Sequence, residues 1–186
     1  MRIRFVVSAC LAGIPCRYDG RANTCSAVVR LVASGCAVPA CPEWLGGLPT
    51  PRPPCELHHE RVCTCDGVDV TAAFMLGAQR ATDLALRQGC TAAILKSRSP
   101  SCGAGQVYDG SFSGVLRSGQ GLWVRLLLEK ELRLFSEEVW GGREDENGGK
   151  GASSKTEALR KRYGYRTGAG KRGVKALKKS WKRRFL

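Results

Sequence analysis

The sequence predicts an α/β fold, a single domain with one small, mostly parallel sheet flanked by helices, followed by a basic C-terminal tail. Short apolar runs alternate with amphipathic segments over residues 3–135, the order of a parallel sheet with right-handed crossovers. A length of 186 residues with 43% hydrophobic content suits one domain with a sizeable core. Residues 1–137 carry 15 Lys/Arg against 11 Asp/Glu, whereas residues 150–186 carry 14 against Glu157 alone. We therefore expect a nearly neutral domain over 1–137, then a flexible linker and basic tail over 138–186.

The first three elements are a strand, a helix and a strand. Residues 3–7 form a β-branched and aromatic run that stops at small residues, as a buried strand does. Residues 24–33 begin at the capping residue Thr24 and end before Gly35, which predicts a helix. Residues 36–40 form a second short apolar run.

A proline-rich segment separates these elements from the rest of the fold. Residues 42–68 read as a long irregular stretch. Asp69 then caps a helix with apolar residues at three- to four-residue spacing, and Gly89 stops it. A strand over 91–96, a loop over 98–114, a helix over 119–130 and a strand over 132–135 complete the predicted order.

Three cysteines follow the first three predicted strands. Cys10 comes after the first strand, Cys41 after the second, and Cys102 lies in the loop after the third. Because ligand sites of parallel sheets gather at the carboxyl ends of the strands, we expect these three sulfurs to meet on one edge of the sheet.

Three converging thiolates allow more than one chemistry. Structural zinc sites usually take cysteines in closely spaced pairs, which these three do not form. A four-iron cluster is held by thiolates, and with only three of them one iron stays open as a Lewis acid for a soft sulfur atom. Free cysteines are also common as small buried hydrophobic residues. The residues alone leave zinc, an iron–sulfur cluster and simple packing open.

Five blocks in this order resemble the thiouracil desulfidase family, in its short single-domain form. They are VSACLAGIPCRYDG (7–20), VPACPEWLGGLPTPRPPCE (38–56), GVDVTAAFMLGAQRA (67–81), ILKSRSPSCGAGQVYDGSFSG (94–114) and LFSE (134–137). The resemblance implies a [4Fe-4S] cluster on three cysteines with one open iron. That iron takes the sulfur of a thiolated pyrimidine such as thiouracil, and water replaces the sulfur without net redox change.

The resemblance also implies site residues. By motif the cluster ligands are Cys10, Cys41 and Cys102. Glu43 is expected to act as general base on water or to protonate the ring nitrogen. Ser101 is expected to hydrogen-bond the substrate or the tetrahedral intermediate. Lys96, Arg52, Tyr18 and Asp19 lie in the same motifs and either brace loops or contact the cluster.

Other cysteines have a less certain place. Long-form members of the family carry Val where this chain has Cys16, so Cys16 is not counted as a ligand, although its closeness to Cys10 leaves it as a substitute. Five residues within eleven positions form a second group that raises a separate zinc site as an alternative: Cys55, His58, His59, Cys63 and Cys65.

The compartment follows from the apolar segments and the cysteines. The apolar run after Arg4 is too short for a secretory leader, and no stretch reaches the ~18–20 apolar residues of a membrane span. Ten cysteines in a chain with an ordinary core favour free thiols in a reducing cytoplasm over a secreted disulfide protein.

The tail lies outside the resemblance. After Gly173, a narrow apolar stripe runs among Lys and Arg residues, which is typical of a basic amphipathic helix that forms on a partner: Val174, Leu177, Trp181 and Phe185. RNA and an anionic membrane are the candidate partners of residues 150–186, and a solvated disordered tail is the alternative. For the whole chain, the rival to a desulfidase is a non-catalytic metal- or nucleic-acid-binding module that uses this tail.

Overall fold

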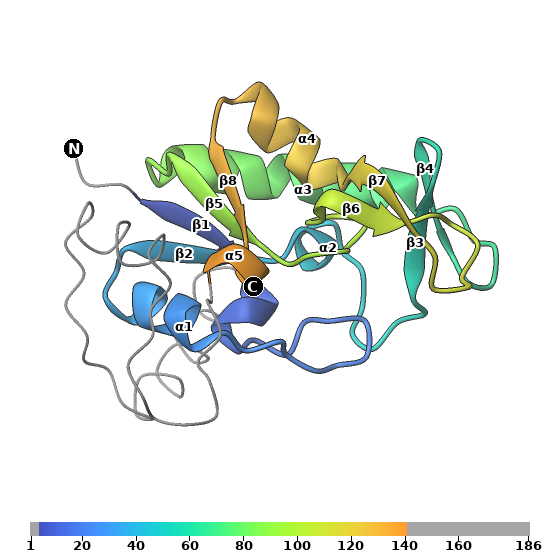
Figure 1. Cartoon of the computed structure of the whole chain (residues 1–186), viewed down its shortest axis with the longest axis horizontal. Coiled ribbons are helices and arrows are strands. Elements are labelled where there is room, and N and C mark those ends of the chain that lie inside the picture. Colours follow the sequence, from blue (N-terminus) through green and yellow to red (C-terminus); the bar gives the residue numbers. More distant parts are fainter. Residues whose placement is uncertain (1–3, 141–186) are drawn as a thin grey trace.

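The computed structural model describes residues 4–140. Four parallel strands form the central sheet, in the order β2-β1-β5-β8: β1 (Phe5–Ser8), β2 (Ala37–Ala40), β5 (Ala92–Leu95) and β8 (Arg133–Ser136). Helices α1 (Ser26–Ala33), α3 (Thr71–Arg87) and α4 (Leu122–Glu129) make the connections between successive strands of the sheet (Figure 1). The predicted α/β class with a mostly parallel sheet is confirmed.

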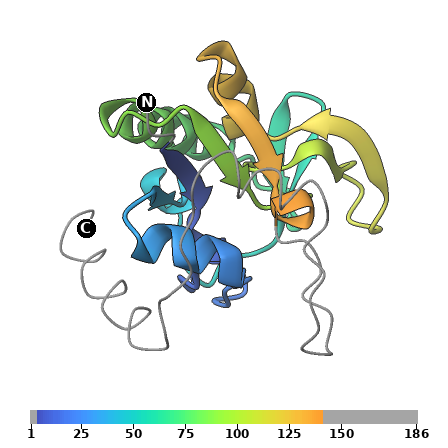
Figure 2. The same cartoon turned by 60° about the vertical axis from the view of Figure 1, so that its left-hand side comes forward.

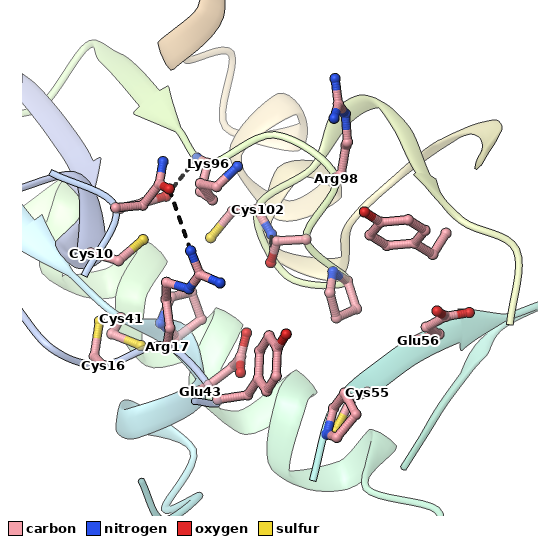
Figure 3. Close-up of a pocket in the computed structure, with 18 of the residues that line it drawn as sticks. Cys10, Cys16, Arg17, Cys41, Glu43, Cys55, Glu56, Lys96, Arg98 and Cys102 are labelled. Atoms are coloured by element: carbon pink, nitrogen blue, oxygen red, sulfur yellow. Dashed lines mark hydrogen bonds between the residues drawn. The ribbon is translucent and has the colours of Figure 1, made fainter. Parts of the chain in front are cut away.

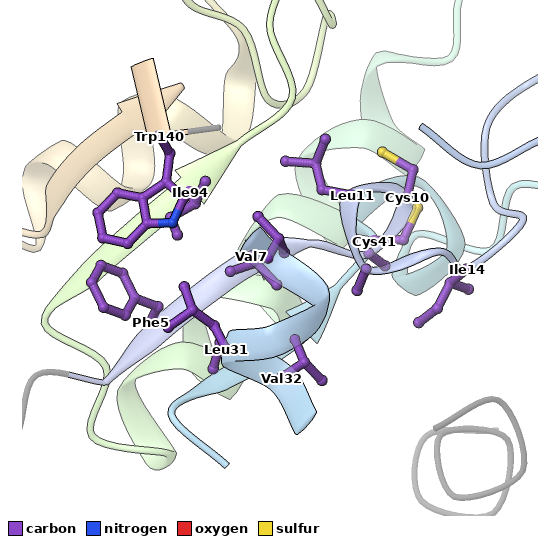
Figure 4. Packing of buried hydrophobic residues seen from close by; sticks show 14 of the residues in the cluster. Phe5, Val7, Cys10, Leu11, Ile14, Leu31, Val32, Cys41, Ile94 and Trp140 are labelled. Carbon is purple, nitrogen blue, oxygen red and sulfur yellow. The ribbon is translucent and has the colours of Figure 1, made fainter. Parts of the chain in front are cut away.

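Helices cover both faces of the sheet, which explains why β1, β2 and β5 are apolar without alternation. Phe5 and Val7 pack with α1 in one core cluster, whereas Val6 packs with α3 and α4 in another. Figure 2 shows α1 and the pair α3 and α4 on opposite sides of the strands. The short helix α5 (Glu137–Trp140) joins the α1 side, where the Trp140 ring lies 5.0 Å from that of Phe5 (Figure 4).

The strand order places a topological switch point between β1 and β5. The chain leaves β1 toward α1 on one face and leaves β5 toward α4 on the other. In sheets of this order the crevice outside the carboxyl ends of these two strands is the usual ligand site.

The segment expected to be irregular, 42–68, contains three regular elements. Helix α2 (Pro42–Leu45) opens it, and β3 (Cys55–His58) pairs with β4 (Arg61–Thr64) as an antiparallel hairpin. The many prolines of this segment predicted an irregular structure. Those next to the hairpin lie before its first strand, where no ladder hydrogen bond is needed, so they do not prevent strand pairing.

The loop expected over 98–114 is also partly regular. A second hairpin pairs β6 (Ala104–Tyr108) with β7 (Leu116–Gln120). The helix expected from residue 119 therefore begins only at Leu122, after this hairpin ends. The expected loop is rich in glycine and lacks the alternation of apolar and polar residues that marks a strand with one buried face, so the sequence did not predict strands there.

Two expected caps differ in detail. Helix α1 begins at Ser26, and its N-cap is Cys25, without a side-chain capping bond, rather than Thr24. Asp69 lies one residue before the N-cap of α3, and its Oδ1 accepts from the Thr71 amide at 2.9 Å and the Thr71 hydroxyl at 2.6 Å. Asp69 thus organises the turn that starts the helix.

Helices α2 and α3 pack with almost no side chain between them. A Cβ added to Gly77 would lie 1.8 Å from the Pro42 carbonyl oxygen, and one added to Gly46 would lie 2.0 Å from that of Ala73. Only glycine permits this approach, which holds α2 against the sheet edge beside the carboxyl ends of the strands.

The remaining predictions concern the membrane and the tail. Within residues 4–140, no helix has the length and apolar character needed to cross a membrane. The predicted linker and tail start inside α5, and residues 141–186 lie outside the described part of the chain.

Candidate active site

A cavity of about 670 Å³ opens at the switch point, and its lining comes from loops that are distant in sequence. Cys10 lies in the short 3-10 helix η1 (Ala9–Ala12) directly after β1. Cys41 joins β2 to α2, and Cys102 follows β5. All three line the cavity and are buried, with exposures of 8%, 7% and 6% (Figure 3). The predicted meeting of three thiols on one edge of the sheet agrees with this geometry.

A fourth thiol, Cys16, shares the cavity. Its side chain hydrogen-bonds with both Cys10 and Cys41. These hydrogen bonds raise the pKa of Cys16, whereas the bond with Cys16 lowers the pKa of Cys10, with the positive charge of Lys96 acting in the same direction. Cys16 is therefore the proton donor of the group, and Cys10 has the thiol that ionises more readily.

Cys102 has a different environment. Burial raises the pKa of its thiol, and a side-chain hydrogen bond with Ser8 partly opposes that effect. The Ser8 hydroxyl also accepts from the Lys96 amide at 3.0 Å, so the ends of β1 and β5 are joined beside Cys102.

Glu43 projects from α2 into the same cavity, where Arg52 holds it. Glu43 Oε2 accepts from both Nε (2.9 Å) and Nη2 of Arg52. Arg52 itself is fixed, because Nη1 donates to the Pro49 carbonyl and Thr50 hydroxyl and Nη2 donates to the Cys16 carbonyl. Two donors of one guanidinium on a single carboxylate oxygen fix the orientation of the carboxylate and stabilise its charge.

Ser101 does not line the cavity directly. It is 1% exposed, and its Oγ donates to Glu43 Oε1 at 3.2 Å. The structure thus joins the two predicted catalytic residues, with the serine behind the carboxylate. A direct bond from Ser101 to substrate stays a prediction.

Lys96 is oriented by a residue to which sequence analysis assigned no role. Its Nζ donates to Glu137 Oε1 at 2.7 Å, and the Ser97 amide and hydroxyl both donate to Glu137 Oε2 at 2.8 Å. Glu137 ends the LFSE block, so its place in a matched motif was the available signal. It ties α5 to the loop after β5.

Sequence reasoning also missed Glu56, because its hydrogen-bond partners lie more than fifty residues away in the chain. Its Oε2 accepts from the Gly110 and Phe112 amides, both at 3.0 Å. Phe112 has a φ of 57°, which is uncommon for a bulky residue. Glu56 thereby anchors the tip of the β6–β7 hairpin at the outer end of the cavity.

The five Cys and His residues considered for zinc lie on the β3–β4 hairpin and its flanks. Their side chains are distributed by strand pairing, in which Cys55 faces Thr64 and Cys63 faces Glu56. Within residues 4–140 no three His, Cys, Asp or Glu side chains surround a common position for a single metal ion.

The donor set of the cavity fits an iron–sulfur cluster. All ten cysteines carry free thiols, and the three at the strand ends are buried soft donors from separate loops. Each ligand of a cluster binds a different iron, so such ligands stand farther apart than those around one ion.

Fold and site together define an α/β protein with a thiol-lined ligand cavity at its switch point. The family model described as 2-thiouracil desulfurase matches residues 5–139. The chain belongs to this 2-thiouracil desulfurase family, and the predicted family and class of enzyme, a desulfidase, are confirmed.

Two known proteins are similar to this chain over most of their own length. A solved structure described as the [4Fe-4S]-dependent thiouracil desulfidase TudS is 47% identical and superposes with a TM-score of 0.70, covering 74% of this chain and 92% of that one. The uncharacterized protein YbbK of Bacillus subtilis (strain 168) is 40% identical over 142 residues, which are 71% of this chain and 94% of YbbK.

Proposed function

We propose that this protein removes sulfur from thiolated pyrimidines such as thiouracil by hydrolytic substitution. The balanced reaction converts C=S and water into C=O and hydrogen sulfide, without net oxidation or reduction. We assign a [4Fe-4S] cluster to Cys10, Cys41 and Cys102, with one iron free of a protein ligand.

The observation that carries this proposal is the placement of Glu43 in one cavity with the three thiols. A cluster-binding protein without hydrolytic activity needs the sulfurs but has no use for a carboxylate oriented by two neighbours. The arginine and serine that hold Glu43 therefore favour an enzyme over a binding module.

The chain's own residues supply the proton transfers. Glu43, oriented by Arg52, accepts a proton from the attacking water and returns it to the ring nitrogen or to the leaving sulfur. Ser101 positions Glu43 through its Oε1. Lys96, oriented by Glu137, adds a positive charge to the cavity wall. When bound, a cluster with one open iron supplies a Lewis acid that binds soft sulfur.

The test is turnover by anaerobically reconstituted protein. Thiouracil is added, and uracil and sulfide are measured together with iron per chain. We expect equal amounts of uracil and sulfide, and no turnover by cluster-free protein. Protein with a full cluster that leaves thiouracil unchanged would remove the proposed substrate.

A further inference from the structure

Cys16 is a buried thiol of the cavity that the proposed reaction does not use. It is 2% exposed and lines the cavity with the three proposed ligands. Its thiol bonds with two of them, Cys10 and Cys41, whereas Cys102 bonds with Ser8. Figure 3 shows Cys16 beside Cys41. The four sulfurs are thus arranged unequally: Cys16 bonds with two of the other thiols, whereas the side-chain partner of Cys102 is a hydroxyl.

The backbone around Cys16 is held by turn and loop hydrogen bonds and by Arg52. Arg52 Nη2 donates to the Cys16 carbonyl at 3.2 Å, and the Cys16 amide donates to the Ile14 carbonyl at 2.9 Å. Residues 13–25 contain no helix or strand, so no ladder of backbone bonds fixes this segment. The Cys16 sulfur can therefore shift locally without breaking a regular element.

We propose that Cys16 is an alternative cluster ligand that can replace Cys41 or Cys10 but not Cys102. This inference rests on the proposed function, because it assumes the cluster. Cys16 is the same soft donor as the two residues that it contacts, and it is already buried in the same cavity. On exchange, the iron–sulfur bond to Cys41 or Cys10 breaks and the Cys16 thiolate bonds to the same iron. The S–H proton of Cys16 passes to the displaced thiolate, with no change of oxidation state.

Cys102 has no such substitute. Its side-chain partner is the Ser8 hydroxyl, a harder and weaker donor for iron than a thiolate. The contacts therefore predict an unequal response to the loss of each proposed ligand.

The experiment compares iron content in matched single and double variants. Cys41→Ser, Cys16→Ser and Cys16→Ser/Cys41→Ser are reconstituted anaerobically, beside Cys102→Ser and Cys16→Ser/Cys102→Ser. Iron, acid-labile sulfide and visible absorbance are measured per chain. We expect Cys41→Ser to keep most of its iron and the Cys16/Cys41 double variant to lose it. Both Cys102 variants should lose the cluster.

Further controls separate the explanations. Alanine versions exclude a serine oxygen as ligand, and circular dichroism of each variant checks folding. If Cys41→Ser fails to fold, the Cys10→Ser pair provides the same comparison. Equal iron in a folded single variant and its Cys16 double variant overturns the assignment of Cys16. Wild-type protein that takes up no cluster overturns the proposed function instead.

Discussion

The Glu43 carboxylate accepts three hydrogen bonds from the protein before any substrate is considered. Two come from Arg52 and one from Ser101. A carboxylate that served only as surface charge would not need this support, because exposed ion pairs contribute little to stability. Substitutions of Glu43 and Ser101 therefore offer the most direct tests of the proposed chemistry.

Replacing Glu43 with Gln is expected to abolish turnover of thiouracil while iron content and visible absorbance stay unchanged. The amide has the size of the carboxylate but cannot accept a proton, and such groups typically contribute about 10²–10⁴-fold. Glu60→Gln, on the exposed turn of the β3–β4 hairpin, is the matched control and should retain full activity. Undiminished turnover in Glu43→Gln would remove the base from the proposal.

Replacing Ser101 with Ala should lower kcat by about 10- to 150-fold, the equivalent of one lost hydrogen bond to a charged group. The double variant with Glu43→Gln decides how Ser101 acts. If the serine acts through Glu43, the double variant is no slower than Glu43→Gln alone. Independent, additive losses would instead indicate a direct bond from Ser101 to the substrate.

The position of Glu43 depends on how helix α2, which carries it, packs against α3. The four residues of α2 lie against α3 at Gly46 and Gly77, where added Cβ atoms would overlap backbone oxygens. Such a short helix has little stability of its own, so this contact places it.

Gly77→Ala tests that contact, because the contact should reverse the sign of the change in the free energy of unfolding. In an unpacked helix interior, this change stabilises by about 1 kcal/mol through helix propensity. Here the overlap with Pro42 should reverse the sign and destabilise the protein by about 1–3 kcal/mol. Chemical denaturation of both proteins measures the difference, with the exposed Gln79→Ala on the same helix as a near-neutral control. A more stable Gly77→Ala variant would contradict the close approach.

Positive charge is distributed unevenly along the chain. The described domain contains the candidate site, whereas residues 150–186 carry fourteen of the thirty Lys and Arg residues. The net charge of +14 therefore bears on partners of the tail and says little about the desulfidase reaction.

Binding of tRNA to the tail is tested by an electrophoretic shift with the full chain and with a chain ending at Trp140. The shorter chain keeps Trp140 because its ring packs against Phe5 and Phe135 in the core. If residues 150–186 bind RNA, only the full chain shifts tRNA, with affinity that falls steeply as salt rises; no shift by either chain favours the solvated tail. Equal binding by both chains would exclude the tail as the RNA-binding segment.

The sequence was enough to predict the parallel order of strands and helices, since local periodicity shows which segments are apolar. It also placed Cys10, Cys41 and Cys102 after successive strands and put Glu43 and Ser101 beside two of them. Two hairpins escaped it: prolines precede the first, and the glycine-containing strands of the second lack a clear alternating pattern.

The tertiary structure was needed to find the further residues that hold these side chains in place. Arg52 bonds with Glu43, and Glu137 bonds with Lys96. Cys16 bonds with Cys10 and Cys41. Each of these contacts joins two different loops or elements of the fold. They depend on the strand order and on the face that each crossover covers, and these follow from packing of the whole core. A local sequence pattern cannot carry that information, because it reports the character of a segment and not its neighbours in space.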